Sequence, residues 1–146
     1  MRYQIYFAYG SNMDEPQFRT RCPGSAILGR AVLRDYRFVI ASRRYASVVP
    51  CNGSVVHGVL CALTPTDEGA LDEYEAVEEG MYRREFLSVE TELGYRVEAL
   101  VYIDTATGEG RPWPGYLEGI LAGARRHGLP ESAVRELESW SLRDGR

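Results

Sequence analysis

The chain has 146 residues, 45% of them hydrophobic, and this predicts one compact domain over residues 1–146 with a flexible tail from about residue 142. All 17 basic residues are arginine, which excludes chemistry that requires lysine, such as a Schiff base or a P-loop. The net charge is −4 and the arginines are scattered, so the dense basic face of a nucleic-acid-binding protein is not expected.

The chain begins with an aromatic strand that runs into a small polar turn. The strand alternates, and four of its residues are expected on one face: Tyr3, Ile5, Phe7 and Tyr9. Gly10-Ser11-Asn12 follows, and a short helix is predicted near residues 13–21. A turn at a strand end and a helix N-terminus directs several backbone N–H groups toward one point, so the sequence predicts a site for a carboxylate or a phosphate.

The middle of the chain predicts antiparallel strands. Residues 27–33 and 36–41 are expected to join at Arg34-Asp35. Residues 45–49 and 54–63 are expected to join at Pro50-Cys51-Asn52-Gly53, whose Asn-Gly pair is a strong hairpin signal. Residues 82–91 and 95–103 form a further predicted hairpin. The sheet should therefore contain six or seven strands.

Helices are predicted between and after these strands. Thr64-Pro65-Thr66-Asp67 is a capping sequence for a helix over residues 66–76. Apolar residues recur at helical spacing from Leu117 to Ala124, and Gly128-Leu129-Pro130 ends that helix before a last one. The predicted class is α+β, with a curved or closed, mostly antiparallel sheet and peripheral helices.

Eight carboxylates lie between residues 67 and 85, and most such residues form a solvated helix face. Glu75 differs because it lies four residues after Leu71 and so continues the apolar stripe. Burial and the negative end of the helix dipole should both raise its pKa, which suits a general acid and base. Asp72 and Glu79 are the nearest alternatives.

The remaining composition predicts a cytoplasmic protein without a metal site. His57 and His127 are far apart in sequence and outside any metal-ligand spacing. No signal-peptide pattern and no apolar run of membrane-spanning length is visible, so no membrane partner is expected. The association state is expected to be a monomer or a homodimer.

An ordered set of short motifs resembles the gamma-glutamylcyclotransferase family (AIG2-like). These motifs, in chain order, are Tyr6-Phe7-Ala8-Tyr9-Gly10-Ser11-Asn12-Met13, Gly58-Val59-Leu60, Leu71-Asp72-Glu73-Tyr74-Glu75, Gly80-Met81-Tyr82, Tyr116-Leu117-Glu118-Gly119-Ile120-Leu121 and Gly128-Leu129-Pro130. The resemblance implies a small mixed β-barrel with flanking helices, a cavity at one end, and no metal or organic cofactor.

The resemblance also implies roles for individual residues. The substrate's carboxylate and carbonyl oxygens would bind a turn made of Tyr9, Gly10, Ser11, Asn12 and Met13. Glu75 takes the place of the family's essential glutamate, and Tyr82 and Tyr116 match tyrosines that line the cavity. The family usually has glycine after that glutamate, whereas this chain has Ala76, which would be strained at a left-handed helix end.

The implied reaction closes the γ-glutamyl group of a small γ-glutamyl amine or peptide into 5-oxoproline and releases the amine. A γ-glutamylamine, a γ-glutamyl amino acid, glutathione and a γ-glutamyl biosynthetic intermediate all remain open as substrates. A module that binds small anions without turnover is the alternative of another class.

Overall fold

The computed structural model describes residues 2–141, and the tail expected from about residue 142 lies outside them. The described part folds into strands, helices and one 3-10 turn, which follow in chain order: β1 (Gln4–Ala8), η1 (Ser11–Met13), α1 (Glu15–Arg21), β2 (Ala26–Ile40), β3 (Ala46–Leu63), α2 (Pro65–Tyr74), β4 (Tyr82–Thr91), β5 (Arg96–Asp104), α3 (Tyr116–Arg126) and α4 (Glu131–Glu138).

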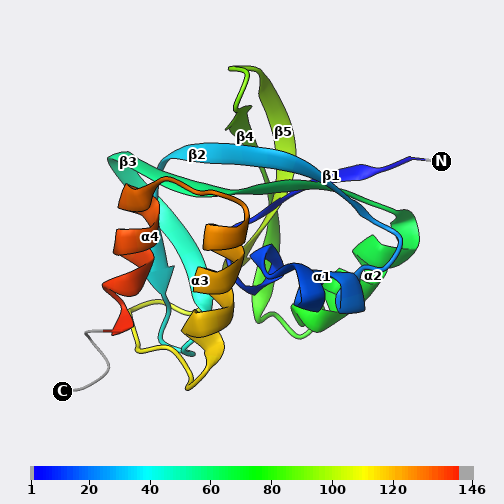
Figure 1. The fold of residues 1–146 in the computed structure, drawn as a ribbon. Helices are drawn as coiled ribbons and strands as arrows, with labels where there is room; N and C mark the ends of the chain where they lie inside the picture. Colours follow the sequence, from blue (N-terminus) through cyan, green and yellow to red (C-terminus); the bar gives the residue numbers. More distant parts are fainter. Residues whose placement is uncertain (1, 142–146) are drawn as a thin grey trace.

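The strands form a closed barrel in the order β1-β3-β2-β4-β5. Neighbouring strands are antiparallel except at the closure, where β1 runs parallel to β5 and Tyr6 pairs with Leu100. Figure 1 shows α3 and α4 side by side, with α1 next to α3 and α2 beyond α1. The α+β class and the mixed barrel are confirmed.

The expected number of six or seven strands is wrong, because the predicted pairs 27–33/36–41 and 45–49/54–63 are two continuous strands, β2 and β3. Their ladder pairs Arg34 with Val55 and then Tyr36 with Pro50, so residues 51–54 stand opposite Asp35 alone. Asp35 has a φ of 66°, and its Oδ1 accepts a hydrogen bond from the Gly53 N–H at 3.0 Å. The Asn-Gly segment is therefore a bulge, and the hairpin turn lies at residues 41–45.

Helix α2 begins as its capping sequence predicts. The Thr64 hydroxyl accepts a hydrogen bond from the Asp67 N–H at 3.1 Å, which satisfies one of the free donors of the first turn. The helix ends at Tyr74, two residues before the predicted end, and Glu75 is its C-cap.

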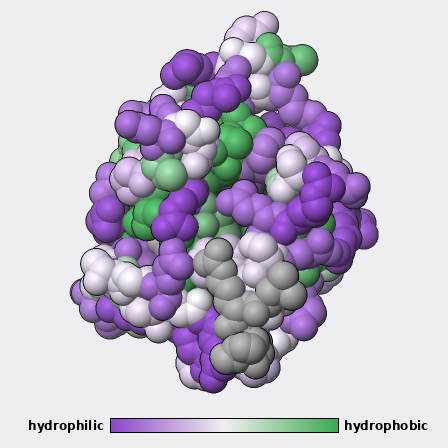
Figure 2. All heavy atoms as spheres, turned by 90° about the vertical axis from the view of Figure 1, so that its left-hand side faces the viewer, coloured by the Kyte–Doolittle hydropathy of each residue, from purple (hydrophilic) through white to green (hydrophobic). Residues whose placement is uncertain are grey.

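Strand β1 is covered on both faces, so the expected alternation is only partly present. Tyr6, Phe7 and Ala8 are all buried, whereas Tyr3 is 57% exposed. On the face shown in Figure 2, hydrophilic residues dominate and hydrophobic ones appear in separate patches. None of the helices within residues 2–141 combines the length and the apolar character needed to span a membrane.

Candidate functional site

One pocket of about 200 Å³ collects nearly all the site residues expected from the sequence. Its walls come from the end of β1 and β5 and from the start of β3 and β4, which the strand directions bring to the same end of the barrel. The lining residues are Tyr6, Tyr9, Gly10, Ser11, Asn12, Tyr45, Ala46, Tyr74, Glu75, Ala76, Met81, Tyr82, Tyr102 and Tyr116.

The turn after β1 presents backbone donors to this pocket. The N–H groups of Ser11 and Asn12 form no hydrogen bond with another described residue, while the Met13 N–H donates to the Gly10 carbonyl at 3.0 Å. A β-carbon at Gly10 would lie 3.2 Å from that of Ala46, so a side chain there would crowd the pocket. The turn can therefore hold an anionic or carbonyl oxygen.

Met13 is the expected site residue that does not line the pocket. Its side chain is buried on the other side of the turn, where α3 packs against η1. A β-carbon at Gly123 in α3 would lie 2.4 Å from the Met13 carbonyl, so glycine is required for this close approach. The Met13 N–H is bonded within the turn and is not one of its free donors, so the expected role of Met13 in ligand binding stays a prediction.

Arg21, at the end of α1, fixes the turn from behind. Its Nη1 donates to Ser11 Oγ at 3.0 Å and to Asn12 Oδ1 at 2.7 Å, and its guanidinium lies 3.9 Å from the Tyr74 ring centroid. Asn12 in turn donates to the Tyr6 hydroxyl at 3.0 Å. Charge-assisted bonds of this kind hold the turn in one conformation.

Tyr82 and Tyr116 are both held by the backbone of Ala46. The Tyr82 hydroxyl donates to the Ala46 carbonyl at 2.7 Å, and the Tyr116 hydroxyl accepts from the Ala46 N–H at 3.0 Å. Tyr116 thus keeps its own O–H to donate, while Tyr82 keeps acceptor capacity. Tyr9 donates its hydroxyl to the Tyr102 carbonyl at 2.5 Å, which ties the end of β1 to that of β5.

Glu75 reaches the pocket because α2 ends in a Schellman motif. The Ala76 N–H donates to the Glu73 carbonyl at 3.0 Å, and the Val77 N–H donates to the Asp72 carbonyl at 3.1 Å. Ala76 holds the left-handed position with a φ of 53°, the conformation in which a β-carbon is strained. The motif turns the chain sharply, so Glu75 and Ala76 both lie on the pocket wall.

The surroundings of Glu75 raise its pKa to about 7. Burial is the main cause, because it removes water from the ionised carboxylate, and the negative charge of Asp104 adds to the rise. The Arg21 guanidinium acts in the opposite sense and lowers the pKa. A carboxyl balanced in this way is half ionised near neutral pH, as an acid and base requires.

The two alternatives to Glu75 have other surroundings. Asp72 accepts two hydrogen bonds from Arg84 Nη1, at 2.7 and 2.9 Å, and one from the Tyr102 hydroxyl at 2.5 Å. This carboxylate is occupied as a structural ion pair. Glu79 is exposed in the loop after α2 and does not line the pocket.

Several residues of the site were not expected from the sequence: Tyr6, Tyr45 and Tyr102, which line the pocket, and Arg21, which holds the turn beside it. Ten tyrosines in one chain signal aromatic walls but do not distinguish which rings face a cavity. Arg21 lies ten residues from its partner Ser11, a separation at which only the fold determines the contact. Within residues 2–141, no group of three or more His, Cys, Asp or Glu side chains is arranged to hold a metal.

Comparison with known proteins agrees with this arrangement. Residues 6–116 match the family model described as "Gamma-glutamyl cyclotransferase, AIG2-like". The human protein named gamma-glutamylcyclotransferase is 29% identical over 96% of this chain and 80% of its own length.

Solved structures of similar proteins have the same fold. One named gamma-glutamyl cyclotransferase superposes with a TM-score of 0.89 at 28% identity, over 94% of this chain and 88% of that one. YkqA from Bacillus subtilis superposes with a TM-score of 0.84 at 27% identity, over 95% of this chain and 54% of its own. With the match of the family model over residues 6–116, this chain belongs to the gamma-glutamyl cyclotransferase, AIG2-like family.

Proposed function

We propose that this protein converts the γ-glutamyl group of a small γ-glutamyl amine or peptide into 5-oxoproline and releases the amine, with Glu75 as general acid and base. One observation carries the proposal: a carboxyl whose pKa is raised to about 7 faces the same pocket as the free N–H groups of Ser11 and Asn12. The curated relatives carry the name of this activity.

The reaction needs little more than a folded substrate and one proton carrier. The α-amine nitrogen attacks the γ-carbonyl carbon and closes a five-membered ring, and the bond from that carbon to the leaving nitrogen breaks. Glu75 takes a proton from the α-ammonium group, whose pKa is about 7.7 to 8.0, and returns one to the leaving nitrogen. Charge on the γ-oxygen is stabilised by the N–H groups of the turn.

The tyrosines place the substrate. Tyr6 and Tyr116 each accept a hydrogen bond through oxygen and keep an O–H to donate, so both can bind substrate oxygens. Tyr9 and Tyr82 are anchored to the backbone and form walls that exclude water. Contacts of this kind are stronger where the pocket walls exclude water.

The direct test mixes the purified protein with a panel of γ-glutamyl amino acids, γ-glutamylamines and glutathione and measures 5-oxoproline by mass spectrometry. We expect product from at least one member of the panel. Silence across the panel would favour the alternative, a module that binds small anions at the turn without turnover. The same panel ranks the open substrate classes.

The proton carrier is tested by Glu75→Gln, which keeps the shape of the side chain and removes its ionisation. We expect kcat to fall by about 10²- to 10⁴-fold, as for the loss of a general acid and base. In the wild type, kcat/KM should rise with pH through about 7 as Glu75 ionises. Glu73→Gln is the matched control, because Glu73 is exposed on the same helix. Full activity in Glu75→Gln would remove this residue from the mechanism.

A further inference from the structure

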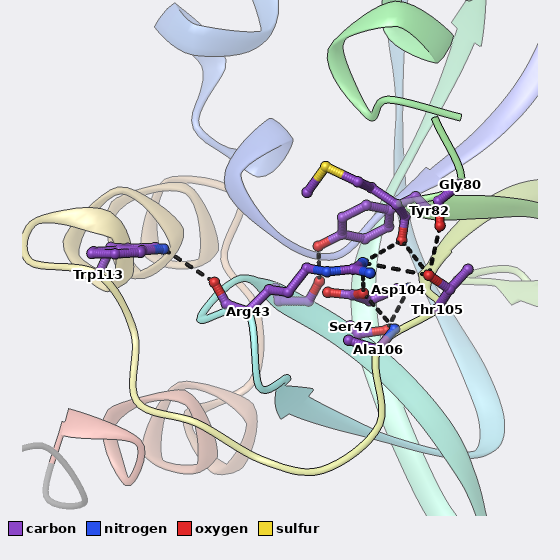
Figure 3. A network of polar contacts seen from close by, with 10 residues as sticks. Arg43, Ser47, Gly80, Tyr82, Asp104, Thr105, Ala106 and Trp113 are labelled. Carbon is purple, nitrogen blue, oxygen red and sulfur yellow. Dashed lines mark hydrogen bonds and ion pairs between the residues drawn. The ribbon is translucent and has the colours of Figure 1, made fainter. Parts of the chain in front are cut away.

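Arg43, in the hairpin turn between β2 and β3, joins three segments that carry pocket walls. Figure 3 shows its guanidinium pointing toward Asp104 and Thr105 at the end of β5. Its Nη1 donates to Asp104 Oδ1 at 2.8 Å and to the Met81 carbonyl at 2.9 Å, and its own carbonyl accepts from the Trp113 indole at 3.1 Å.

The loop of residues 75–81 is attached to the barrel mainly at this point. The Met81 carbonyl also accepts from the Thr105 N–H at 2.9 Å, and the Thr105 hydroxyl donates to the Gly80 carbonyl at 2.7 Å. The other end of the loop is Glu75 itself, in the Schellman turn. The contacts of Arg43 and Thr105 with Gly80 and Met81 therefore limit how far Glu75 can move from the pocket.

Asp104 is a buried carboxylate in this network, and only one of its two oxygens is hydrogen-bonded within the described part of the chain. Its side chain is fully buried, and Oδ1 receives both of its hydrogen bonds, from Arg43 and from the Ala106 N–H at 2.8 Å. Oδ2 is buried and has no hydrogen-bond partner among the described residues. A charge satisfied on one oxygen only is incompletely neutralised, and in a dry interior its field reaches neighbouring groups.

The Asp104 backbone also connects to residues of the pocket wall. Its N–H donates to Ser47 Oγ at 2.9 Å, and Ser47 follows Ala46, the residue that holds Tyr82 and Tyr116. The network thus links the loop with Glu75, the tyrosine anchor and the end of β5.

We propose that Arg43 and Asp104 are positioning residues for the reaction at Glu75: the pair holds the 75–81 loop against the pocket, and the buried Asp104 carboxylate adds negative charge on the Glu75 side of the barrel. The part of this inference that concerns turnover rests on the proposed function. The part that concerns the loop and the charge does not.

The charge effect has a definite sign. The Asp104 carboxylate raises the pKa of Glu75, of Tyr9 and of Tyr82. Arg21 is the cation that faces Glu75 from α1 and opposes this effect. The tyrosines coupled to Glu75 come from β1, β4, β5 and α3: Tyr6, Tyr9, Tyr82, Tyr102 and Tyr116. These phenols stay neutral across the working range, so Arg21 and Asp104 are the two charges that modify the rise in the Glu75 pKa caused by burial.

The test compares Asp104→Asn, Arg43→Gln and Arg43→Lys with a control, Arg34→Gln. Arg34 pairs with Glu90 at 2.7 Å on the outside of the barrel, away from the pocket. Two measurements use the free protein: the titration of the Glu75 carboxyl by NMR, and hydrogen exchange of the amides in the 75–81 loop. The pH profile of 5-oxoproline formation is the third.

We expect Asp104→Asn to lower the Glu75 midpoint by about half a pH unit or more, because a like charge is lost. Arg43→Gln should speed exchange in the loop by roughly tenfold or more. Arg43→Lys should restore most of the protection, because one Arg43 nitrogen makes all three of its side-chain contacts and an ammonium offers three donors. Arg34→Gln should change neither quantity.

An unchanged Glu75 midpoint in Asp104→Asn, or unchanged loop exchange in Arg43→Gln, would overturn the proposal. Circular dichroism and thermal melting separate these outcomes from a failure to fold, and Arg43→Lys provides a variant that keeps the charge. If the wild type forms no 5-oxoproline, the proposed function fails, while titration and exchange still decide the role of Arg43 and Asp104.

Discussion

At the scale of single residues, Glu75 combines a position useful for proton transfer with a cost in stability. Its pKa in the folded protein is about 7, above the ordinary value of 4.5. The folded state therefore binds more protons than the unfolded state between these two values. By linkage, the contribution of Glu75 to stability is greatest below pH 4.5 and is lost as the pH rises through 7.

This sign predicts that Glu75→Gln is more stable than the wild type at pH 8. The neutral amide removes a penalty on the order of 2 kcal/mol at pH 8, and much less of it at pH 5, where the buried carboxyl is already protonated. Urea denaturation at both pH values measures the difference. Equal stability of the two proteins at pH 8 would mean that the carboxyl is well solvated.

Ala76 gives a second prediction at this scale. Its φ of 53° costs alanine roughly 1 to 2 kcal/mol, whereas glycine adopts it freely. Glycine also gains freedom in the unfolded chain, so Ala76→Gly should stabilise the protein by up to about 1 kcal/mol. The control is Ala70→Gly in the exposed middle of α2, where the same change should cost about 1 kcal/mol. Thermal melting of both variants would reveal opposite signs.

The position of Glu75 on the pocket wall could be predicted from the sequence, and the contact of Arg21 with the turn could not. Glu75 lies one helical turn after the buried Leu71, so the periodicity of α2 indicates the face on which it lies, although the helix itself ends one residue earlier, at Tyr74. The contact of Arg21 with Ser11 and Asn12 depends on how α1 packs beside the turn, and no local pattern carries that information. The same holds for Arg43 and Asp104, which are 61 residues apart.

At the scale of elements, the bulge between β2 and β3 shows how tertiary structure overrides a turn signal. Asn52-Gly53 has the residues of a hairpin, but its backbone preference for positive φ is equally suited to a bulge. Burial decides between them: residues on either side, such as Val48 and Val56, both belong to the core. The sequence therefore locates the irregularity correctly and mistakes its type.

The bulge supports a prediction with a close control. Gly53 has a φ of 84°, and a β-carbon there would meet no other described residue within 4 Å. Gly53→Ala should therefore cost about 1 kcal/mol through backbone strain alone. Gly69 in α2 is equally open but helical, and Gly69→Ala should stabilise by about 0.5 to 1 kcal/mol. Chemical denaturation of the two variants should give opposite shifts in midpoint.

At the scale of the whole molecule, α3 and α4 cover one side of the barrel. Trp140 follows α4, is 2% exposed and packs edge-to-face on Phe38 of β2 at 6.3 Å between ring centroids. This contact places the last described segment in the same core as the strands. The helices therefore belong to the folding unit and are not an appendage.

Trp140→Ala should accordingly lower the free energy of unfolding by about 3 to 5 kcal/mol, because the cavity left behind cannot collapse fully. Trp140→Phe should cost less, since it keeps an aromatic ring against Phe38. Urea denaturation monitored by circular dichroism measures both changes. A loss below about 1 kcal/mol for Trp140→Ala would mean that the end of the chain packs loosely.

The barrel closes through a single backbone pair between β1 and β5, Tyr6 with Leu100. Tyrosine side chains reinforce this seam: the Tyr9 hydroxyl reaches across to the Tyr102 carbonyl, and the Tyr6 and Tyr102 rings meet edge to face at 5.7 Å between centroids. Since Tyr6, Tyr9 and Tyr102 also line the pocket, a ligand bound beside them would contact both ends of this seam. Such a ligand would stabilise the closure between β1 and β5, and its release would weaken the barrel next to the pocket.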